Sequence, residues 1–92
     1  MIVVRTAGEL DAFLATPLGR ETEPIIAPHL ERLAEYEFED IAAIAVRDRG
    51  ETVRSLGLDP DCYEYRTEHP GFVEEVHIVS DDGFGWIILT RT

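Results

Sequence analysis

The sequence predicts an α+β fold, with a mainly antiparallel sheet of four to five strands and two N-terminal helices packed on one face. Three observations lead to this class. The 92 residues suffice for one modest core, so residues 1–92 are expected to form a single domain. Helical signals are concentrated before residue 41, and β-branched or alternating segments dominate after it. The last twenty residues have the pattern of a β-hairpin.

A strand and a short helix are expected first. Residues 2–5, IVVR, form a β-branched run that is typical of a strand. Thr6 and Glu9 have the spacing of a capping box, in which each side chain bonds the other residue's backbone N–H. Apolar side chains then recur at helical spacing, so a helix is expected over residues 7–15.

Prolines decide where the main helix is expected. Pro24 and Pro28 suit a first helical position but not a helix interior, because proline has no N–H to donate. Residues 16–24, TPLGRETEP, are therefore expected to end the first helix and form a non-helical connection. The main helix is expected over residues 28–37, which would place His29 in its first turn.

The middle of the chain mixes short elements with turns. Residues 41–48, IAAIAVRD, are expected to form a buried strand, although their alanines would also suit a helix. Thr52 can cap a single helical turn and Gly57 can end it. CYEYR at 62–66 alternates like a strand, and HPG at 69–71 suits a type II turn.

The C-terminal hairpin can be placed in register by counting outward from Asp82-Gly83 as a two-residue primed turn. In that register Glu74 faces Arg91 as a cross-strand charge pair. One face, expected to be the core side, then carries Val76, Ile78, Ile87 and Leu89. The other face carries Trp86, Ile88, His77 and Val79, which are expected either to pack under another element or to form a second interface, such as a homodimer contact.

The charge of the chain is strongly negative. Nineteen acids oppose eight arginines, with no lysine, for a net charge of −11. Such a surface repels phosphates, so neither direct nucleic-acid binding nor binding to anionic membranes is expected. It suits docking on a basic partner. No secretory signal or membrane span is visible, and the single Cys62 excludes a disulfide within the chain, so a cytoplasmic location is expected.

An acid-rich run, HLERLAEYEFED at 29–40, is the main candidate for a binding surface. With two acids just upstream it could form a stripe spaced like phosphates, able to occupy an arginine- and lysine-lined groove. A solvated helix face is the other interpretation, because like charges one turn apart cost only a few tenths of a kcal/mol. The candidate partner-binding residues are Glu21, Glu23, Glu31, Glu35, Glu37, Glu39 and Asp40.

No residue pattern indicates catalysis or a metal. The three histidines and Cys62 lack paired ligand spacing. Asp81 and Asp82 are too few, and their turn too tight, to wrap a calcium ion. We therefore expect no catalytic residue, no metal and no cofactor, and a small enzyme is the less favoured alternative.

The C-terminal half also resembles a known group. IAVRDRGETVRSLGL at 44–58 and EHPGFVEEVHIVSDDGFGWIIL at 68–89 resemble small acidic proteins of bacterial plasmids, phages and other mobile elements that share an SDDGFG hairpin. The resemblance covers about residues 41–92. The group has no established activity, so no functional residue is carried over. The resemblance implies a context in which small acidic proteins inhibit host defence or regulate by protein contact.

Together these observations predict a non-enzymatic inhibitor or adaptor from a mobile element. It would mimic nucleic acid, in the manner of anti-CRISPR or anti-restriction proteins, and dock on the basic surface of a nucleic-acid-binding host defence protein. The alternative is an interaction module that forms a homodimer through the Trp86 face of the hairpin.

Overall fold

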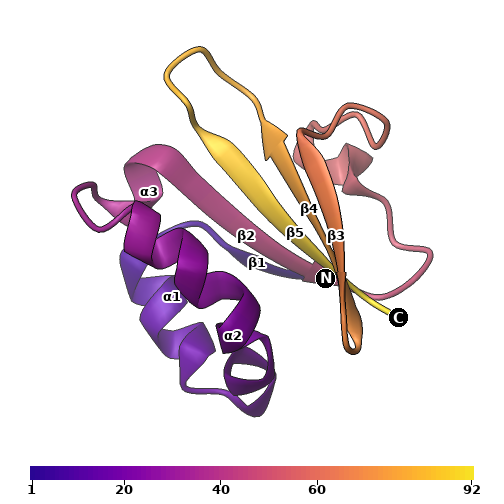
Figure 1. Cartoon of the computed structure of the whole chain (residues 1–92), viewed down its shortest axis with the longest axis horizontal. Helices are drawn as coiled ribbons and strands as arrows, with labels where there is room; N and C mark the ends of the chain where they lie inside the picture. The colour runs from indigo at the N-terminus through magenta and orange to yellow at the C-terminus, as the bar shows by residue number, and fades with distance from the viewer.

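The computed structural model describes residues 1–92 and contains one five-stranded sheet with helices on one side (Figure 1). The elements are, in chain order, β1 (Ile2–Val4), α1 (Ala7–Leu14), α2 (Pro17–Arg32), α3 (Phe38–Ile41), β2 (Ala42–Arg47), the 3₁₀ helix η1 (Val53–Leu56), β3 (Tyr65–His69), β4 (Phe72–Ile78) and β5 (Gly85–Arg91). No helix is both long and apolar enough to span a membrane.

The sheet is mixed, with the strand order β1-β2-β5-β4-β3. β2 and β5 run parallel, and the three other neighbouring pairs are antiparallel. Helices α1 and α2 lie on one side of the sheet, and the segment that contains η1 lies on the other (Figure 1). The predicted α+β class is therefore confirmed, with one parallel pair inside a mainly antiparallel sheet.

Helix α1 forms where its capping box predicts. The Thr6 hydroxyl accepts from the Glu9 N–H, and the Glu9 carboxylate accepts from the Thr6 N–H. Thr16 caps α2 in turn, because its hydroxyl accepts from the N–H of Gly19. The hydroxyl of Thr16 also donates to the Phe13 carbonyl at the end of α1, so one side chain joins the two helices.

The prediction that the main helix begins at Pro28 is wrong. α2 begins at Pro17 and continues through Pro24 and Pro28. Both interior prolines are exposed, so water can hydrate the carbonyls that lose a helical donor. Ile26 and the other apolar residues on the opposite side of the helix are buried against the sheet, and this burial outweighs the local cost. His29 accordingly lies in the last turn of α2 and not in the first.

Most of the shorter predicted elements are confirmed. Residues 42–47 form the strand β2, and the Thr52 hydroxyl accepts from the Arg54 N–H at the start of η1. Gly57 ends η1 with φ +79°, a left-handed conformation that favours glycine. Gly71 takes φ +85° in the turn between β3 and β4, as the predicted turn requires. β3 begins at Tyr65, three residues later than predicted.

The C-terminal hairpin differs from the prediction by a register shift of two residues. His77 faces Trp86, and Arg91 faces Phe72, so the predicted Glu74–Arg91 pair does not form. The turn comprises residues 80–83, in which the Gly83 N–H donates to the Ser80 carbonyl. Its two central residues are therefore Asp81 and Asp82, and not the predicted Asp82 and Gly83. A shift of two leaves every side chain on its predicted face, since the side-chain period of a strand is two.

Two cores lie on the two faces of the sheet. The larger core packs α1 and α2 on the sheet and includes Ile26, Ile44 and Leu89. The smaller one includes Val53 of η1 and Leu58, packed with Trp86 and Ile88 of β5 and two alanines of β2. Alanines on β2 leave room for Trp86 beneath the η1 segment. The sheet is therefore covered on both faces, by helices on one side and by a short irregular segment on the other.

Candidate functional site

The helical layer of the molecule carries the strongest negative charge. Residues 7–41 hold nine acids and two arginines, a net charge of −7, whereas the remaining 57 residues together carry −4. All seven of the predicted partner-binding acids are exposed, and none of them forms an ion pair within the chain. We refer to these seven as the acidic helical surface: Glu21, Glu23, Glu31, Glu35, Glu37, Glu39 and Asp40.

Its members fall into two groups. Glu31 lies in the last turn of α2, and the four acids that follow it lie in the connection to α3 and in α3 itself. α2 ends at Arg32, so Glu31 and Glu35 do not share one helix as predicted. Glu21 and Glu23 lie near the other end of α2, about 15 Å away along the helix axis at about 1.5 Å per residue.

The second face of the hairpin is mostly covered by the chain itself. Trp86, Ile88 and His77 are no more than 4% exposed. The η1 segment packs over Trp86 and Ile88, and the Tyr63 ring lies edge-on to the His77 ring at a centroid distance of 6.3 Å. The guanidinium of Arg5 stacks over the Trp86 ring, 4.9 Å from its centre. Val79 alone is exposed, in the turn between β4 and β5. This face therefore packs under another element, and a homodimer that uses it would have to dock on or displace the covering segment.

A buried polar network lies between α2 and the sheet. At its centre the Glu74 carboxylate of β4, 5% exposed, accepts hydrogen bonds from three side chains. His29 of α2 is one donor, through Nε2. His69 of β3 donates through Nε2 at 2.8 Å, and the Tyr65 hydroxyl donates at 3.3 Å. Three donors satisfy a carboxylate that would otherwise be costly to bury.

The outer member of the network fixes the protonation of the histidine ring. Arg32 Nη2 lies 2.7 Å from Nδ1 of His29. A guanidinium has only donors, so Nδ1 must accept and the ring proton must be on Nε2, which points at Glu74. His29 is therefore neutral and links a guanidinium to a carboxylate, with both ring nitrogens hydrogen-bonded.

The network shifts two pKa values in opposite directions. Burial opposes ionisation of Glu74, but the hydrogen bonds from His29 and His69 outweigh it, so the pKa of Glu74 lies below its ordinary value. Burial raises the pKa of Tyr65, helped by the negative charge of Glu74. At neutral pH Glu74 is therefore an ionised acceptor, and Tyr65 is a protonated donor.

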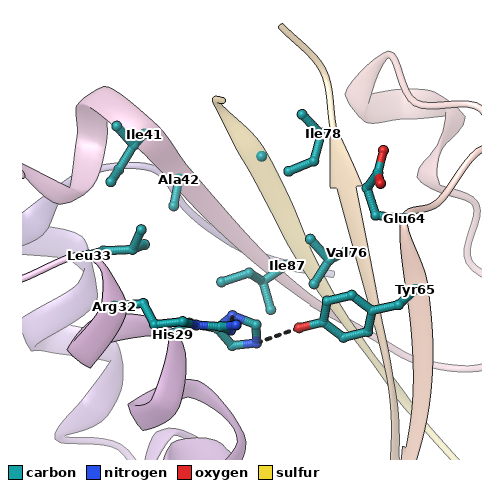
Figure 2. A pocket seen from close by; sticks show the side chains of 11 residues that line it. His29, Arg32, Leu33, Ile41, Ala42, Glu64, Tyr65, Val76, Ile78 and Ile87 are labelled. Carbon is teal, nitrogen blue, oxygen red and sulfur yellow. Dashed lines mark hydrogen bonds between the residues drawn. The ribbon is translucent and has the colours of Figure 1, made fainter. Parts of the chain in front are cut away.

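An apolar pocket of about 290 Å³ opens beside this network (Figure 2). Figure 2 shows Val76 and Ile87 of the sheet between the His29 and Tyr65 rings on one side and Ile41 and Ile78 on the other. The two rings are nearly parallel, at an interplanar angle of 10° and a centroid distance of 6.5 Å. Among the polar residues of the lining, His29, Arg32 and Tyr65 belong to the hydrogen-bonded network. The Glu64 carboxylate also lines the pocket, and it forms no ion pair within the chain.

The network therefore joins α2 to the sheet through hydrogen bonds and forms one end of the apolar pocket. Sequence reasoning missed it, because its members are scattered over α2, β3 and β4 and show no recognisable spacing. Glu74 gave the one available signal. It lies between Phe72 and Val76 at a spacing of two residues, so its side chain shares their buried face of β4, and a buried carboxylate needs hydrogen-bond donors. His29 and His69, described as isolated in the sequence, are brought together on that one carboxylate.

Comparisons of the chain with protein-family models, with curated proteins and with solved structures found no match. The functional argument therefore depends on the geometry and charge of this molecule.

Proposed function

We propose that the chain is a non-enzymatic protein-binding inhibitor or adaptor whose acidic helical surface docks in a basic groove that normally holds nucleic acid. One observation carries the proposal: all seven carboxylates of this surface face solvent, and none forms an ion pair with an arginine of the chain. Carboxylates left without partners keep their full charge for the cations of another protein.

The asymmetry of the charge supports the same proposal. The helical layer carries −7 of the net −11 in little more than a third of the chain. A groove that binds DNA or RNA presents arginines and lysines to a row of phosphates, and a negative surface on a rigid scaffold can replace that row. The resemblance to acidic proteins of mobile elements favours partners of the CRISPR or restriction type. Such a partner acts in the cytoplasm, where the chain would meet it.

Displacement of DNA tests the proposal directly. A labelled duplex is bound to purified CRISPR and restriction nucleases, and the chain is added while fluorescence anisotropy is measured. We expect displacement from at least one nuclease, with an affinity that falls as salt rises, because the contacts are between exposed charges. The triple variant Glu35→Lys/Glu37→Lys/Glu39→Lys should weaken displacement at least about tenfold, or about 1.4 kcal/mol.

The matched control reverses three exposed acids outside the helical layer. Asp61→Lys/Asp81→Lys/Asp82→Lys changes the net charge equally and removes no ion pair. It should retain displacement within about twofold of the wild type. If both triple variants lost displacement equally, the effect would come from net charge and not from the acidic helical surface. If the wild type displaced DNA from no nuclease, the proposal that its partner is a nuclease of this kind would be wrong.

A further inference from the structure

The face of the sheet opposite the helices carries a pocket of opposite charge. Its volume is about 360 Å³, within the usual range of about 300–1,000 Å³ for small-molecule sites. Four of the chain's eight basic residues line it, although the chain as a whole carries −11. We call it the arginine pocket, and its lining comprises Arg47, Arg49, Arg66, Arg91, Glu68, Glu75, Val73, Thr90 and Thr92.

Strand register brings these side chains together. Arg47 of β2 pairs with Thr90 of β5, and Thr90 pairs with Val73 of β4. Arg66 of β3 pairs with Glu75 of β4 in the same part of the sheet. The four guanidinium groups thus come from β2, the turn after it, β3 and the end of β5, and no single sequence motif contains them.

One arginine side chain is held by hydrogen bonds within the chain, and the other three are not. Arg47 donates from Nε to the Thr90 hydroxyl at 2.8 Å and from Nη1 to the Glu51 carbonyl at 2.6 Å, and its Nη2 lies 3.5 Å from Glu75. The side chains of the remaining three arginines form no hydrogen bond within the chain, although the Arg91 guanidinium lies over the Phe72 ring, 5.7 Å from its centre. They are Arg49, Arg66 and Arg91.

The carboxylates nearby only partly offset this charge. Arg66 lies 3.6 Å from Glu68, and Arg91 lies 3.3 Å from Asp48, both in exposed ion pairs that contribute little. Within the lining itself, four guanidinium groups face two carboxylates. Like charges gathered in one place repel each other, and an anion that bridged them would relieve that repulsion.

We propose that the arginine pocket binds a small multivalent oxyanion of the phosphate type. A guanidinium presents its donors as a planar fork that matches two phosphate oxygens, and three of the four forks in this pocket make no hydrogen bond within the chain. A long polyanion is a poor fit, because the negative charge of the rest of the molecule would repel phosphates beyond the pocket. The pocket lies on the opposite face from the acidic helical surface, so it is independent of the proposed function.

Titration calorimetry at constant ionic strength tests this assignment with four probes: inorganic phosphate, triphosphate, ATP and a short DNA duplex. We expect saturable binding of triphosphate that is tighter than that of phosphate, because triphosphate carries more negative charge than a single phosphate. ATP binding tighter than triphosphate would identify a nucleotide as the source of the phosphate group, and equal affinities would identify the phosphate chain alone. Both results support the pocket.

Paired variants locate the binding. Arg49→Gln/Arg66→Gln removes two guanidinium groups that form no hydrogen bond within the chain and should weaken triphosphate binding at least about tenfold. Arg20→Gln/Arg54→Gln removes the same charge from two exposed arginines outside the pocket and should change the affinity less than about twofold. Circular dichroism should show both variants folded, since none of the four side chains forms a hydrogen bond in the chain.

Three results would overturn the assignment. They are absence of saturable triphosphate binding to the wild type, equal loss of affinity in the two paired variants, and binding of the DNA duplex that is tighter than that of triphosphate. The first would leave the arginines as solvated surface charges. The second would indicate nonspecific attraction, and the third would indicate a nucleic-acid surface.

Discussion

Glu74 is the buried charged residue that joins α2 and β3 to β4 through hydrogen bonds. Its carboxylate is buried between a helix and two strands, and it accepts from His29, His69 and Tyr65. Arg32 completes the set of charged and titratable groups that face it, through Nδ1 of His29. Because every donor comes from α2 or β3, loss of the negative charge would weaken the packing of both elements against β4.

Replacement of Glu74 by glutamine should destabilise the fold in a pH-dependent way. The pKa of Glu74 is lowered by folding, so its contribution is complete above the unfolded pKa, about 4.3, and is lost as pH falls through the lower folded pKa. Glu74→Gln should cost about 1.5–3 kcal/mol at pH 7, the range for hydrogen bonds to a charged group. The cost should shrink as pH falls below that unfolded value.

Urea unfolding of both proteins across this pH range measures the difference. Glu68→Gln serves as the control, because Glu68 is an exposed glutamate of β3 whose one ion pair is weak. It should change the unfolding free energy by less than about 0.5 kcal/mol. A Glu74→Gln cost that stayed constant with pH would contradict the ionised state assigned to the carboxylate.

At the scale of elements, the backbones of α1 and α2 approach each other closely at their junction. A Cβ added at Gly19 would lie 1.9 Å from the carbonyl oxygen of Phe13, so backbone approaches backbone there. The hydroxyl of Thr16 bonds both residues and sets the angle between the helices. Gly19 is thus required for close approach and not for an unusual φ.

Substitution at two helical glycines tests this explanation. Gly19→Ala should lower the unfolding free energy by about 1–3 kcal/mol or more, because the backbone of α1 must move. Gly8→Ala in α1 meets nothing within 4 Å and should raise it by about 0.5–1 kcal/mol through helix propensity. Denaturant titration of the two variants should give effects of opposite sign, and a stabilising Gly19→Ala would refute the contact.

Elements with strong local signals are those that the sequence predicts well. The capping box of α1, the turn at Gly71 and the glycine that ends η1 each act over a few residues, so they survive in the fold. α2 was predicted wrongly because the rule for Pro24 and Pro28 is also local, and burial of the opposite side of the helix overrides it.

The candidate sites follow the same division. Exposure of the acids between residues 31 and 40 follows from composition and was predictable. The buried network and the arginine pocket depend on strand order and register, which place Glu74 beside two histidines and bring Arg47 of β2 and Arg66 of β3 to the same pocket. A register error of two residues, such as the one made for the hairpin, assigns each of these side chains the wrong neighbour.

For the whole molecule, the dominant physical quantity is the net charge of −11 within about 33 × 33 × 21 Å. Four ion pairs join the chain's acids to an arginine or to the N-terminal amine, and two histidines contact Glu74. Most carboxylates therefore repel one another through solvent, and compact folding brings them closer than in the unfolded chain.

Salt should consequently stabilise the fold. Raising NaCl from about 10 mM to about 150 mM shortens the Debye length from about 30 Å, the size of the molecule, to about 8 Å. We expect the thermal midpoint to rise over this range, and to rise less for Glu35→Lys/Glu37→Lys/Glu39→Lys, whose net charge is smaller. A midpoint that fell with salt would mean that the ion pairs outweigh the repulsion.

The position of β5 has a consequence for how the chain reaches this state. The last strand in sequence lies between β2 and β4, where it joins the N-terminal ribbon β1-β2 to the C-terminal ribbon β3-β4. During synthesis, residues 1–84 can form only two separate ribbons, so the sheet cannot close until Gly85–Arg91 leaves the ribosome. The two ribbons therefore join only once β5 is available, and until then the nascent chain exposes unpaired edges of β2 and β4 that chaperones could bind.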